Sequence, residues 1–248
     1  MKTFRLIRSP QASASYNMAL DAAIFARYLK DAIPVFRVYA WAEPSFTFGA
    51  SQKPESEIDV KCCERNGVGI AGRMTGGGVL FHNDEITYSF ACGKADVGEP
   101  ASALVSYREI CAFLIKFYNT IGLSASFACE APDFKDKSVP HELCSASHEK
   151  YDIVIKEKKI GGNAQKRTRQ AIFQHGSIPC SIDWSAMGRY VKGLPDDIYR
   201  HVTTLAQELV KVPDKNILEQ KLIDAFAVTF DVKFIEEDGS SYEAGMVK

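Results

Sequence analysis

The chain has 248 residues, of which 46% are hydrophobic and 25% charged, and its 30 basic and 31 acidic side chains leave a net charge of -1. These values are typical of a globular protein that can bury a sizeable core, and they exclude the disordered, collagen-like and coiled-coil classes. Such a balanced charge provides no field for binding a nucleic-acid backbone, because only the segment 156–169 is locally basic.

The N-terminal segment lacks the pattern of a secretory signal. Lys2, Arg5 and Arg8 interrupt any apolar run there. No stretch of the sequence reaches the length of a membrane span. The seven cysteines are an odd number in a chain large enough to fold without disulfides, which favours free thiols in a reducing compartment. We therefore expect a cytoplasmic protein with neither a membrane nor a nucleic acid as its partner.

The first part of the chain predicts helices and strands on both sides of a glycine-rich loop. Apolar residues recur at helical spacing after Ser15, which can cap the helix. Two segments rich in β-branched and aromatic residues then predict a pair of strands joined by the turn at 43–45. In chain order we expect a helix at 15–29, strands at 35–41 and 46–49, a short helix at 57–66, and strands at 68–71, 79–81 and 86–92.

The second part of the chain predicts a long helix, a hairpin and a helical C-terminal region. The long helix ends at Gly122, and the segment after it alternates as an edge strand does. In chain order we expect a helix at 102–121, an edge strand at 124–129, a loop at 130–150, a hairpin of 151–155 with 160 onward, a strand at 171–178, helices at 185–193 and 215–230, and a strand at 232–235.

These elements do not follow a regular βαβ rhythm, and no internal repeat or Pro/Ser-rich linker divides the chain. The pattern predicts an α+β fold with mixed, largely antiparallel sheets on which helices pack. We expect a single domain over 1–248, mainly helical from about residue 185 and without an accessory domain.

The glycine-rich loop runs from Gly72 to His82 and contains three consecutive glycines after Arg73-Met-Thr. Consecutive glycines cost backbone entropy, which is typical of a loop whose N–H groups approach a ligand. Arg73 would supply a positive charge for a carboxylate, thioester or phosphate group. A β-bulge or tight turn explains the glycines about equally well. Neither a Walker A motif nor a dinucleotide fingerprint fits, because the glycines precede a predicted strand.

Lys159 directly precedes a second glycine pair, in the segment Lys159-Ile-Gly-Gly-Asn-Ala-Gln165. A lysine at the start of a strand can point inward and polarise an acyl carbonyl in a partly dry pocket. The alternative interpretation is that Lys156, Lys158 and Lys159 form the solvated tip of a hairpin, which the charge run alone favours.

Cys144 lies in the predicted loop, close to His141 and His148. Neighbouring histidines and the basic hairpin after it could lower the pKa of this thiol and make it an acyl acceptor. A buried, unreactive cysteine is the common alternative. Cys129, His141, Cys144 and His148 could also bind zinc, but their spacing matches no familiar structural site, so we expect no metal.

Several of these segments resemble, in the same order, the lipoate–protein ligase and octanoyltransferase family, which is related to the biotin ligases. The resemblance covers about residues 4–185. The matching segments are Asn17-Met-Ala-Leu-Asp21, Arg37-Val-Tyr-Ala-Trp41 with Pro44, Gly49 and Gln52, Arg73-Met-Thr-Gly-Gly-Gly78 with His82, Lys159-Ile-Gly-Gly-Asn-Ala-Gln165, and Gln174-His-Gly-Ser-Ile178.

Within this family, the segment Glu85-Ile-Thr-Tyr-Ser89 and the place of Cys144 are similar to the cysteine-dependent octanoyltransferases. The resemblance implies that octanoyl-acyl carrier protein acylates Cys144, and that a lysine of a lipoyl domain or glycine-cleavage H protein then attacks the thioester. Lys159 would be the second catalytic residue, and no cofactor would be needed. The implied substrate-binding residues are Arg73, Thr75, Gly76, Gly77, Gly78, His82, Gly162, Ala164, Gln165 and His175.

Three positions depart from the family pattern: Gly72 where many relatives have an arginine, Asn83 where many have an aspartate, and Ser145 where a phenylalanine would be expected. Two alternatives therefore stay open. One is a lipoate–protein ligase of the same fold, which would use ATP and Mg. The other is a non-catalytic protein that binds a lipoyl domain or an acyl carrier.

Overall fold

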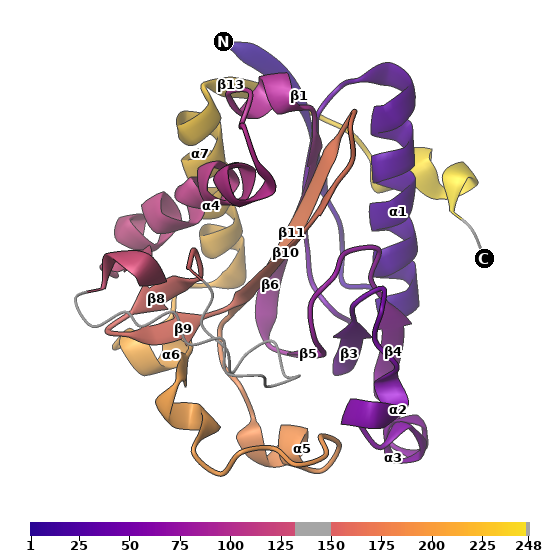
Figure 1. Cartoon of the computed structure of the whole chain (residues 1–248), viewed down its shortest axis with the longest axis vertical. Helices are drawn as coiled ribbons and strands as arrows, with labels where there is room; N and C mark the ends of the chain where they lie inside the picture. The colour runs from indigo at the N-terminus through magenta and orange to yellow at the C-terminus, as the bar shows by residue number, and fades with distance from the viewer. Residues whose placement is uncertain (132–149, 247–248) are drawn as a thin grey trace.

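The computed structural model, which describes residues 1–131 and 150–246, is built around a six-stranded sheet in the order β10-β11-β6-β2-β1-β13 (Figure 1). The pairs from β10 to β2 are antiparallel, whereas β2, β1 and β13 are parallel neighbours. Its strands are β1 Lys2–Arg8, β2 Val35–Tyr39, β6 Glu85–Cys92, β10 Gly162–Arg167, β11 Ile172–Pro179 and β13 Val232–Glu236.

Two smaller sheets lie beside this main sheet, with strand orders β4-β3-β5 and β12-β9-β8-β7. The first carries the glycine-rich loop between β4 and β5, and the second carries Lys159 in β9. Their strands are β3 Ser45–Phe48, β4 Gly69–Gly72 and β5 Leu80–His82, and β7 Ala125–Phe127, β8 Ile153–Ile155, β9 Lys158–Ile160 and β12 Val202–Thr203.

Helices cover both faces of the main sheet. Figure 1 shows α1 on one side and the pair α4 and α7 on the other. The α-helices are α1 Ala14–Asp31, α2 Pro54–Glu57, α3 Val60–Arg65, α4 Ala103–Thr120, α5 Trp184–Gly188, α6 Leu205–Glu208 and α7 Lys215–Phe230, and the short 3-10 helices are η1 Lys94–Val97, η2 Ala128–Glu130, η3 Ile198–Arg200 and η4 Gly239–Gly245.

Alternation along the strands produces one apolar layer on each face of the main sheet. Phe36 and Phe90 pack with α7 on one face, where the rings of Phe36 and Phe226 stack 4.0 Å apart. Their strand neighbours, Val35 and Ala91, pack with the α1 side on the other. Because side chains of successive strand residues point to opposite faces, this arrangement buries β2 and β6 on both sides.

The predicted α+β class with mixed sheets is confirmed, and so are the long helices. The predicted cap of α1 was wrong: it lies two residues earlier than expected, where the side chain of Ser13, not Ser15, accepts a hydrogen bond from the Tyr16 N–H. The helix ends at Ala32, which has a left-handed φ of 54°.

A hairpin forms at the predicted place, but its second strand is not the predicted one: β8 pairs antiparallel with β9, which ends at Ile160, whereas the residues that follow form β10 of the main sheet. Lys156 and Glu157 take the positive φ of 48° and 67° that a two-residue turn of this kind requires.

Three further predictions about elements were wrong. The expected strand pair does not form, because β2 belongs to the main sheet whereas β3 pairs with β4 and β5. The helix expected at 57–66 is two helices, since Ile58 is extended and Asp59 caps α3 by accepting from the Cys62 N–H. The helix expected at 185–193 ends earlier, at Gly188.

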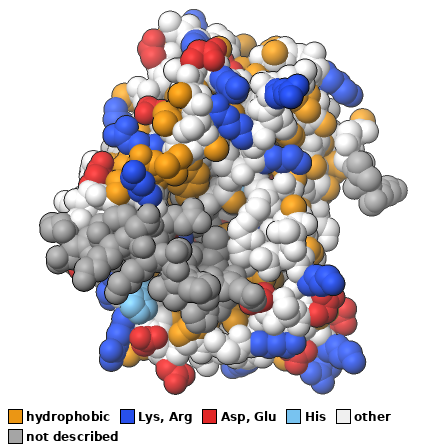
Figure 2. All heavy atoms as spheres, viewed as in Figure 1, with side chains coloured by type: hydrophobic (Ala, Val, Ile, Leu, Met, Phe, Trp, Pro, Cys, Tyr) orange, Lys and Arg blue, Asp and Glu red, His pale blue; other side chains and the backbone are white. Residues whose placement is uncertain are grey.

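The described part of the chain contains no helix long and apolar enough to cross a membrane. On the face that Figure 2 shows, Lys and Arg side chains are spread over the surface, with acidic side chains among them at the lower margin. This view shows no single dense basic patch of the kind that binds a nucleic-acid backbone.

Candidate active site

The glycine-rich loop is fixed from inside by the side chain of Arg73. This guanidinium is buried and donates to the Thr47 carbonyl at 2.8 Å and to the Gly78 carbonyl at 2.7 Å. It therefore connects the loop to β3. The sequence predicts an anion contact for Arg73, and this role stays a prediction.

Glycines are required where the loop lies against Gly49. A Cβ atom at Gly49 would lie 2.1 Å from the Gly77 carbonyl oxygen. Gly77 itself has a φ of 95°, a backbone conformation that favours glycine. Gly76, in contrast, has open space around its Cα. The glycines thus permit a close backbone contact on one side and leave an accessible backbone on the other.

Gly76 and Gly77 line a cavity with about 1140 Å³ of empty space when the part open to solvent is included, and Lys159 and Asp152 line the same cavity. We call it the outer cavity. The Nζ of Lys159 lies 2.8 Å from Oδ2 of Asp152, and both side chains are 4% exposed. The interpretation of Lys159 as part of a solvated hairpin tip is therefore wrong. The same interpretation is correct for Lys156, whose side chain is 78% exposed.

Strand pairing on both edges of β9 directs Lys159 inward. Its N–H donates to the His201 carbonyl at 2.9 Å, and its Cα is in register with Val154 of β8 and Val202 of β12. A lysine that is positioned in this way and paired with a buried carboxylate can present a fixed positive charge to an acyl carbonyl.

A second, smaller cavity, with about 260 Å³ of empty space when the part open to solvent is included, shares Ala164 with the outer cavity. We call it the inner cavity. Its lining combines apolar and aromatic side chains with six polar ones, several of which are held by hydrogen bonds, an arrangement that suits a small group with an apolar part. It is lined by Met18, Tyr39, Trp41, Thr47, Arg73, Leu80, His82, Thr87, Gly162, Ala164, His175, Gly176 and Ser177.

One hydrogen-bond network joins the glycine-rich loop to α1 through His175. The Thr75 hydroxyl lies 2.8 Å from Nε2 of His175, whose Nδ1 lies 3.5 Å from Oδ2 of Asp21. Burial lowers the pKa of His175. Burial alone would raise the pKa of Asp21, but the Arg37 guanidinium 2.8 Å away and the contact with His175 together lower it.

These pKa directions assign the protons in this network. The Asp21 carboxylate is ionised and can only accept, so the proton of the neutral imidazole is on Nδ1 of His175. The Thr75 hydroxyl then donates to Nε2. The loop is thereby connected to a buried ion pair in the protein core.

A second network surrounds Glu85, whose hydrogen-bond partners line the inner cavity. Its Oε1 lies 2.9 Å from Nδ1 of His82 and accepts from Nε1 of Trp41 at 3.0 Å, while Oε2 accepts from the Ser177 hydroxyl at 2.8 Å. Burial alone would raise the pKa of Glu85, but His82 and the hydroxyl donors lower it. The His82 ring stacks on Trp41 at 4.1 Å, so the carboxylate fixes both aromatic walls.

Gln165 takes part in a buried chain of amides and hydroxyls beneath the outer cavity. Its Oε1 accepts from Ser106 of α4 at 2.7 Å, and its Nε2 donates to Gln174 of β11 at 2.9 Å. Gln174 in turn donates to the Tyr88 hydroxyl at 2.9 Å. These contacts hold β10, which carries Gly162 and Ala164, against the helix.

The predicted site residues that the structure describes thus lie around the two cavities, although they come from segments far apart in the sequence. Cys144 lies outside the described residues, as do Ser145 and the histidines of the zinc alternative. Gly72 and Asn83 are exposed. The outer cavity contains Gly76, Gly77, Lys159, Ala164 and Gln165, and the inner cavity contains Arg73, His82, Gly162, Ala164 and His175, with Thr75 and Gly78 bonded to members of the second set.

Sequence reasoning did not assign roles to Asp21, Glu85 or Asp152, which are the three buried carboxylates of the site. Asp21 offered a signal, because it lies on the same helix face as Met18 and Phe25. Burying a charged side chain on an apolar face costs free energy unless the charge is paired. The sequence offers no comparable signal for Asp152 and Glu85, because the burial of each carboxylate depends on a partner that the fold places beside it.

The sequence is similar to enzymes of lipoyl attachment. A model of the family described as the lipoyl protein ligase A/B catalytic domain matches residues 13–227. Octanoyltransferase LipM of Clostridioides difficile is 29% identical over 257 residues, covering 100% of this chain and 94% of the relative. Octanoyltransferase LipM of Kyrpidia tusciae is 33% identical over 190 residues, covering 75% of this chain and 69% of the relative.

The fold is similar to solved lipoate–protein ligases. A crystal structure of lipoate-protein ligase A bound with ATP superposes with a TM-score of 0.78 at 23% identity, covering 99% of this chain and 94% of that one. A bi-partite lipoate protein ligase from Thermoplasma acidophilum, studied with its E2 lipoyl domain, gives a TM-score of 0.77 at 20% identity, covering 99% and 92%. At these identities the likeness shows the fold alone.

Proposed function

Because the chain belongs to the lipoyl protein ligase A/B catalytic domain family, as its motifs predicted, we propose that it is an acyltransferase that attaches octanoyl groups to proteins in lipoylation. The observation that carries the proposal is the pair of neighbouring cavities. The glycine-rich loop and the buried Lys159 line the outer cavity, which adjoins the apolar inner cavity at Ala164.

In the proposed reaction, the alkyl chain of the octanoyl group lies in the inner cavity and its carbonyl in the outer cavity. The Lys159 ammonium, held by Asp152 at 2.8 Å, interacts with the carbonyl oxygen and stabilises the negative charge that develops on it. Such a charge in a partly dry site is among the largest contributions to acyl transfer.

We propose that the acyl group passes through Cys144. The Cys144 thiolate attacks the thioester carbonyl of octanoyl-acyl carrier protein, and the carrier thiolate leaves and takes up a proton. The amine of a target lysine then attacks the enzyme thioester, the C–S bond breaks, and the Cys144 sulfur leaves as thiolate while the amine loses a proton. The product is an amide, and the cysteine is regenerated.

Two features of the described chain support a role for Cys144. Lys150 and Tyr151, at one end of the segment 132–149, line the outer cavity. The Lys150 carbonyl accepts from the Cys129 N–H at 3.0 Å, so the described residues on the two sides of that segment lie together near the site. Cys144 is six residues before Lys150, a span of at most roughly 20 Å.

The proposed donor is octanoyl-acyl carrier protein, and the proposed acceptor is a lysine of a lipoyl domain or glycine-cleavage H protein. This reaction needs neither ATP nor Mg, because the donor thioester already carries an activated acyl group. The ligase alternative would need both, and the non-catalytic alternative would bind its partner without a covalent product.

One experiment separates these functions. The purified chain is incubated with octanoyl-acyl carrier protein and a lipoyl domain, or with octanoate, ATP, Mg and the same domain, and all proteins are weighed by mass spectrometry. We expect octanoyl-lipoyl domain only from the carrier donor, and an octanoylated enzyme when the acceptor is omitted. Cys144→Ala should lose both products, whereas Cys62→Ala, at a partly exposed cysteine, should keep them. Full transfer by Cys144→Ala would exclude the thioester step.

A further inference from the structure

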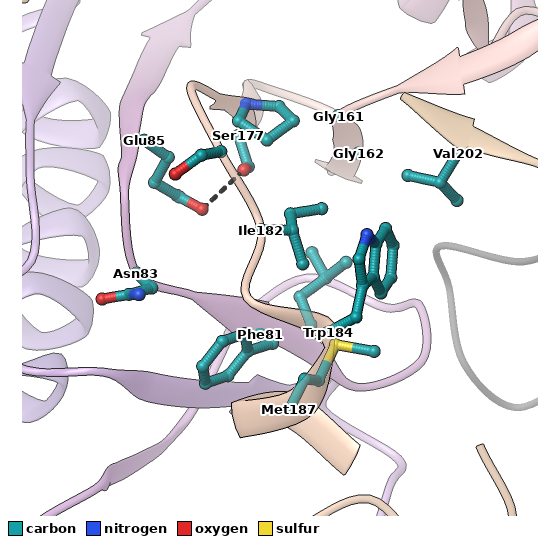
Figure 3. A pocket seen from close by; sticks show the side chains of 13 residues that line it. Phe81, Asn83, Glu85, Gly161, Gly162, Ser177, Ile182, Trp184, Met187 and Val202 are labelled. Atoms are coloured by element: carbon teal, nitrogen blue, oxygen red, sulfur yellow. Dashed lines mark hydrogen bonds between the residues drawn. The ribbon is translucent and has the colours of Figure 1, made fainter. Parts of the chain in front are cut away.

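A third cavity lies next to the inner cavity (Figure 3), with about 580 Å³ of empty space when the part open to solvent is included. We call it the side cavity. Figure 3 shows Phe81 and Met187 on one side of it, Val202 on the opposite side, and the Glu85–Ser177 hydrogen bond at its upper end. Most of its remaining lining is apolar and includes Ile182 and Trp184. It is therefore a site for an apolar group, beside the site proposed for the acyl chain.

Leu80, Gly162 and Ser177 line both the inner and the side cavity, so they form the wall between them. Leu80 is the only one of these three with a sizeable apolar side chain. A Cβ atom at Gly162 would lie 3.4 Å and 3.7 Å from the two methyl carbons of Leu80, so the Leu80 isobutyl group lies across the Gly162 backbone. It therefore lies at the boundary between the two cavities.

The conformation of β5 holds Leu80 in that place. Leu80 and His82 both line the inner cavity, as expected for strand residues two positions apart, and the intervening Phe81 points to the other face and packs against Phe46 at 4.9 Å. His82 is fixed by Glu85 at 2.9 Å. The position of Leu80 is therefore determined by its neighbours on the strand.

We propose that Leu80 is a specificity-determining residue that limits the length of the acyl chain, and that the side cavity can hold the distal methylenes of a longer chain. This inference rests on the proposed function. In the wild type, the Leu80 side chain ends the acyl site at the wall. When that side chain is shortened, the inner and side cavities form one continuous apolar channel.

The expected change in specificity follows from apolar burial. Each further methylene that leaves water for an apolar cavity favours binding by about fourfold. An acyl chain two carbons longer should therefore bind up to about 15-fold more tightly than octanoyl, once the Leu80 side chain no longer blocks it.

The test measures kcat/KM for hexanoyl through tetradecanoyl thioesters of acyl carrier protein with a lipoyl domain as acceptor. For Leu80→Ala we expect the optimum to move from eight carbons to ten or twelve. Leu80→Val should move it less, and Leu80→Phe should favour chains shorter than eight carbons. Leu29→Ala, at a side chain of α1 that is 46% exposed, should keep the wild-type profile.

A second substitution tests whether the side cavity itself takes the longer chain. Ile182 lines the side cavity but not the inner cavity. Ile182→Phe in the Leu80→Ala background should refill the new space and return the optimum towards eight carbons.

The results distinguish this inference from the function on which it rests. A wild type that transfers no octanoyl group from any donor would contradict the proposed function. A wild type that is active, with folded Leu80→Ala and Leu80→Val variants whose chain-length profiles match it, would overturn the role of Leu80 alone. Longer-chain activity in Leu80→Ala that Ile182→Phe leaves unchanged would exclude the side cavity as the place where the chain lies.

Discussion

The hydroxyl of Thr75 and the imidazole of His175 are 2.8 Å apart, although 100 positions separate them in the sequence. Thr75 belongs to the glycine-rich loop, whereas His175 belongs to β11 and faces the Asp21 carboxylate of α1. This contact connects the glycine-rich loop to a buried ion pair in the core.

Thr75→Val should lower kcat/KM for octanoyl transfer by about tenfold or more. It removes the hydroxyl and leaves Nε2 of His175 buried without this donor, which costs about 1–3 kcal/mol. Thr75→Ser keeps the hydroxyl and should retain most activity. The activities of the two variants are compared by steady-state kinetics with octanoyl-acyl carrier protein, and their stabilities by urea unfolding. Equal activity in the two variants would mean that the bond does not position the loop.

Gly49→Ala should reduce activity more than the small size of the added methyl group suggests. The new methyl group would lie 2.1 Å from the Gly77 carbonyl oxygen, so the glycine-rich loop must move away from β3. A matched control is Gly188→Ala in α5, where the nearest atom would be 3.7 Å away. We expect at least a tenfold loss of kcat/KM for the first variant and no loss for the second. Wild-type kinetics for Gly49→Ala would show that the loop tolerates displacement.

Lys159→Met should abolish measurable transfer and also destabilise the protein. Removing one partner of a buried ion pair leaves the Asp152 carboxylate without its cation and typically costs about 3–5 kcal/mol. The double variant Lys159→Met/Asp152→Leu removes both charges and should recover much of the unfolding free energy. It should not recover activity, because the charge for the acyl carbonyl is still missing. Recovery of both together would mean that Lys159 has only a structural role.

Much of the architecture was predictable because it depends on local patterns. Apolar spacing predicted α1 and α4, since each buries one face of a helix against a sheet. Strand β1 escaped prediction because its charged residues interrupt the apolar pattern. The buried Arg5 of β1 is stabilised by Asp31, 2.7 Å away, and by Glu237, 2.9 Å away.

Partners that the fold brings together could not be predicted in the same way. Nothing in the local sequence indicates that β3 pairs with β4 and β5 instead of β2. Lys156 and Lys159 belong to one charged segment, yet only Lys159 is buried, because the turn between β8 and β9 and the carboxylate of Asp152 separate their environments. The order of motifs predicted the family, whereas the geometry around Lys159 required the three-dimensional structure.

The stability of the protein should fall as the pH decreases below about 6.5. Burial lowers the pKa of His175 from its ordinary value of 6.5, so below that pH the unfolded chain binds a proton at this residue before the folded protein does. The stabilisation that comes from neutral His175 is complete above the pKa of this residue in the unfolded chain. It is lost as the pH falls through the lower pKa that the residue has in the folded protein. Asp21 and Glu85, whose pKa values are also lowered in the fold, add a further loss below about pH 4.

Urea unfolding between pH 5 and 8 measures this effect. For the wild type, the free energy of unfolding should rise with pH up to about 6.5 and then level off. His175→Gln removes the titrating group and should flatten this rise, at the cost of a lower overall stability. His201→Gln, at a histidine whose side chain is 53% exposed, should keep the wild-type slope. If His175→Gln and the wild type share one slope, another group is responsible for the pH dependence, and the neutral His175 inferred from its burial is wrong.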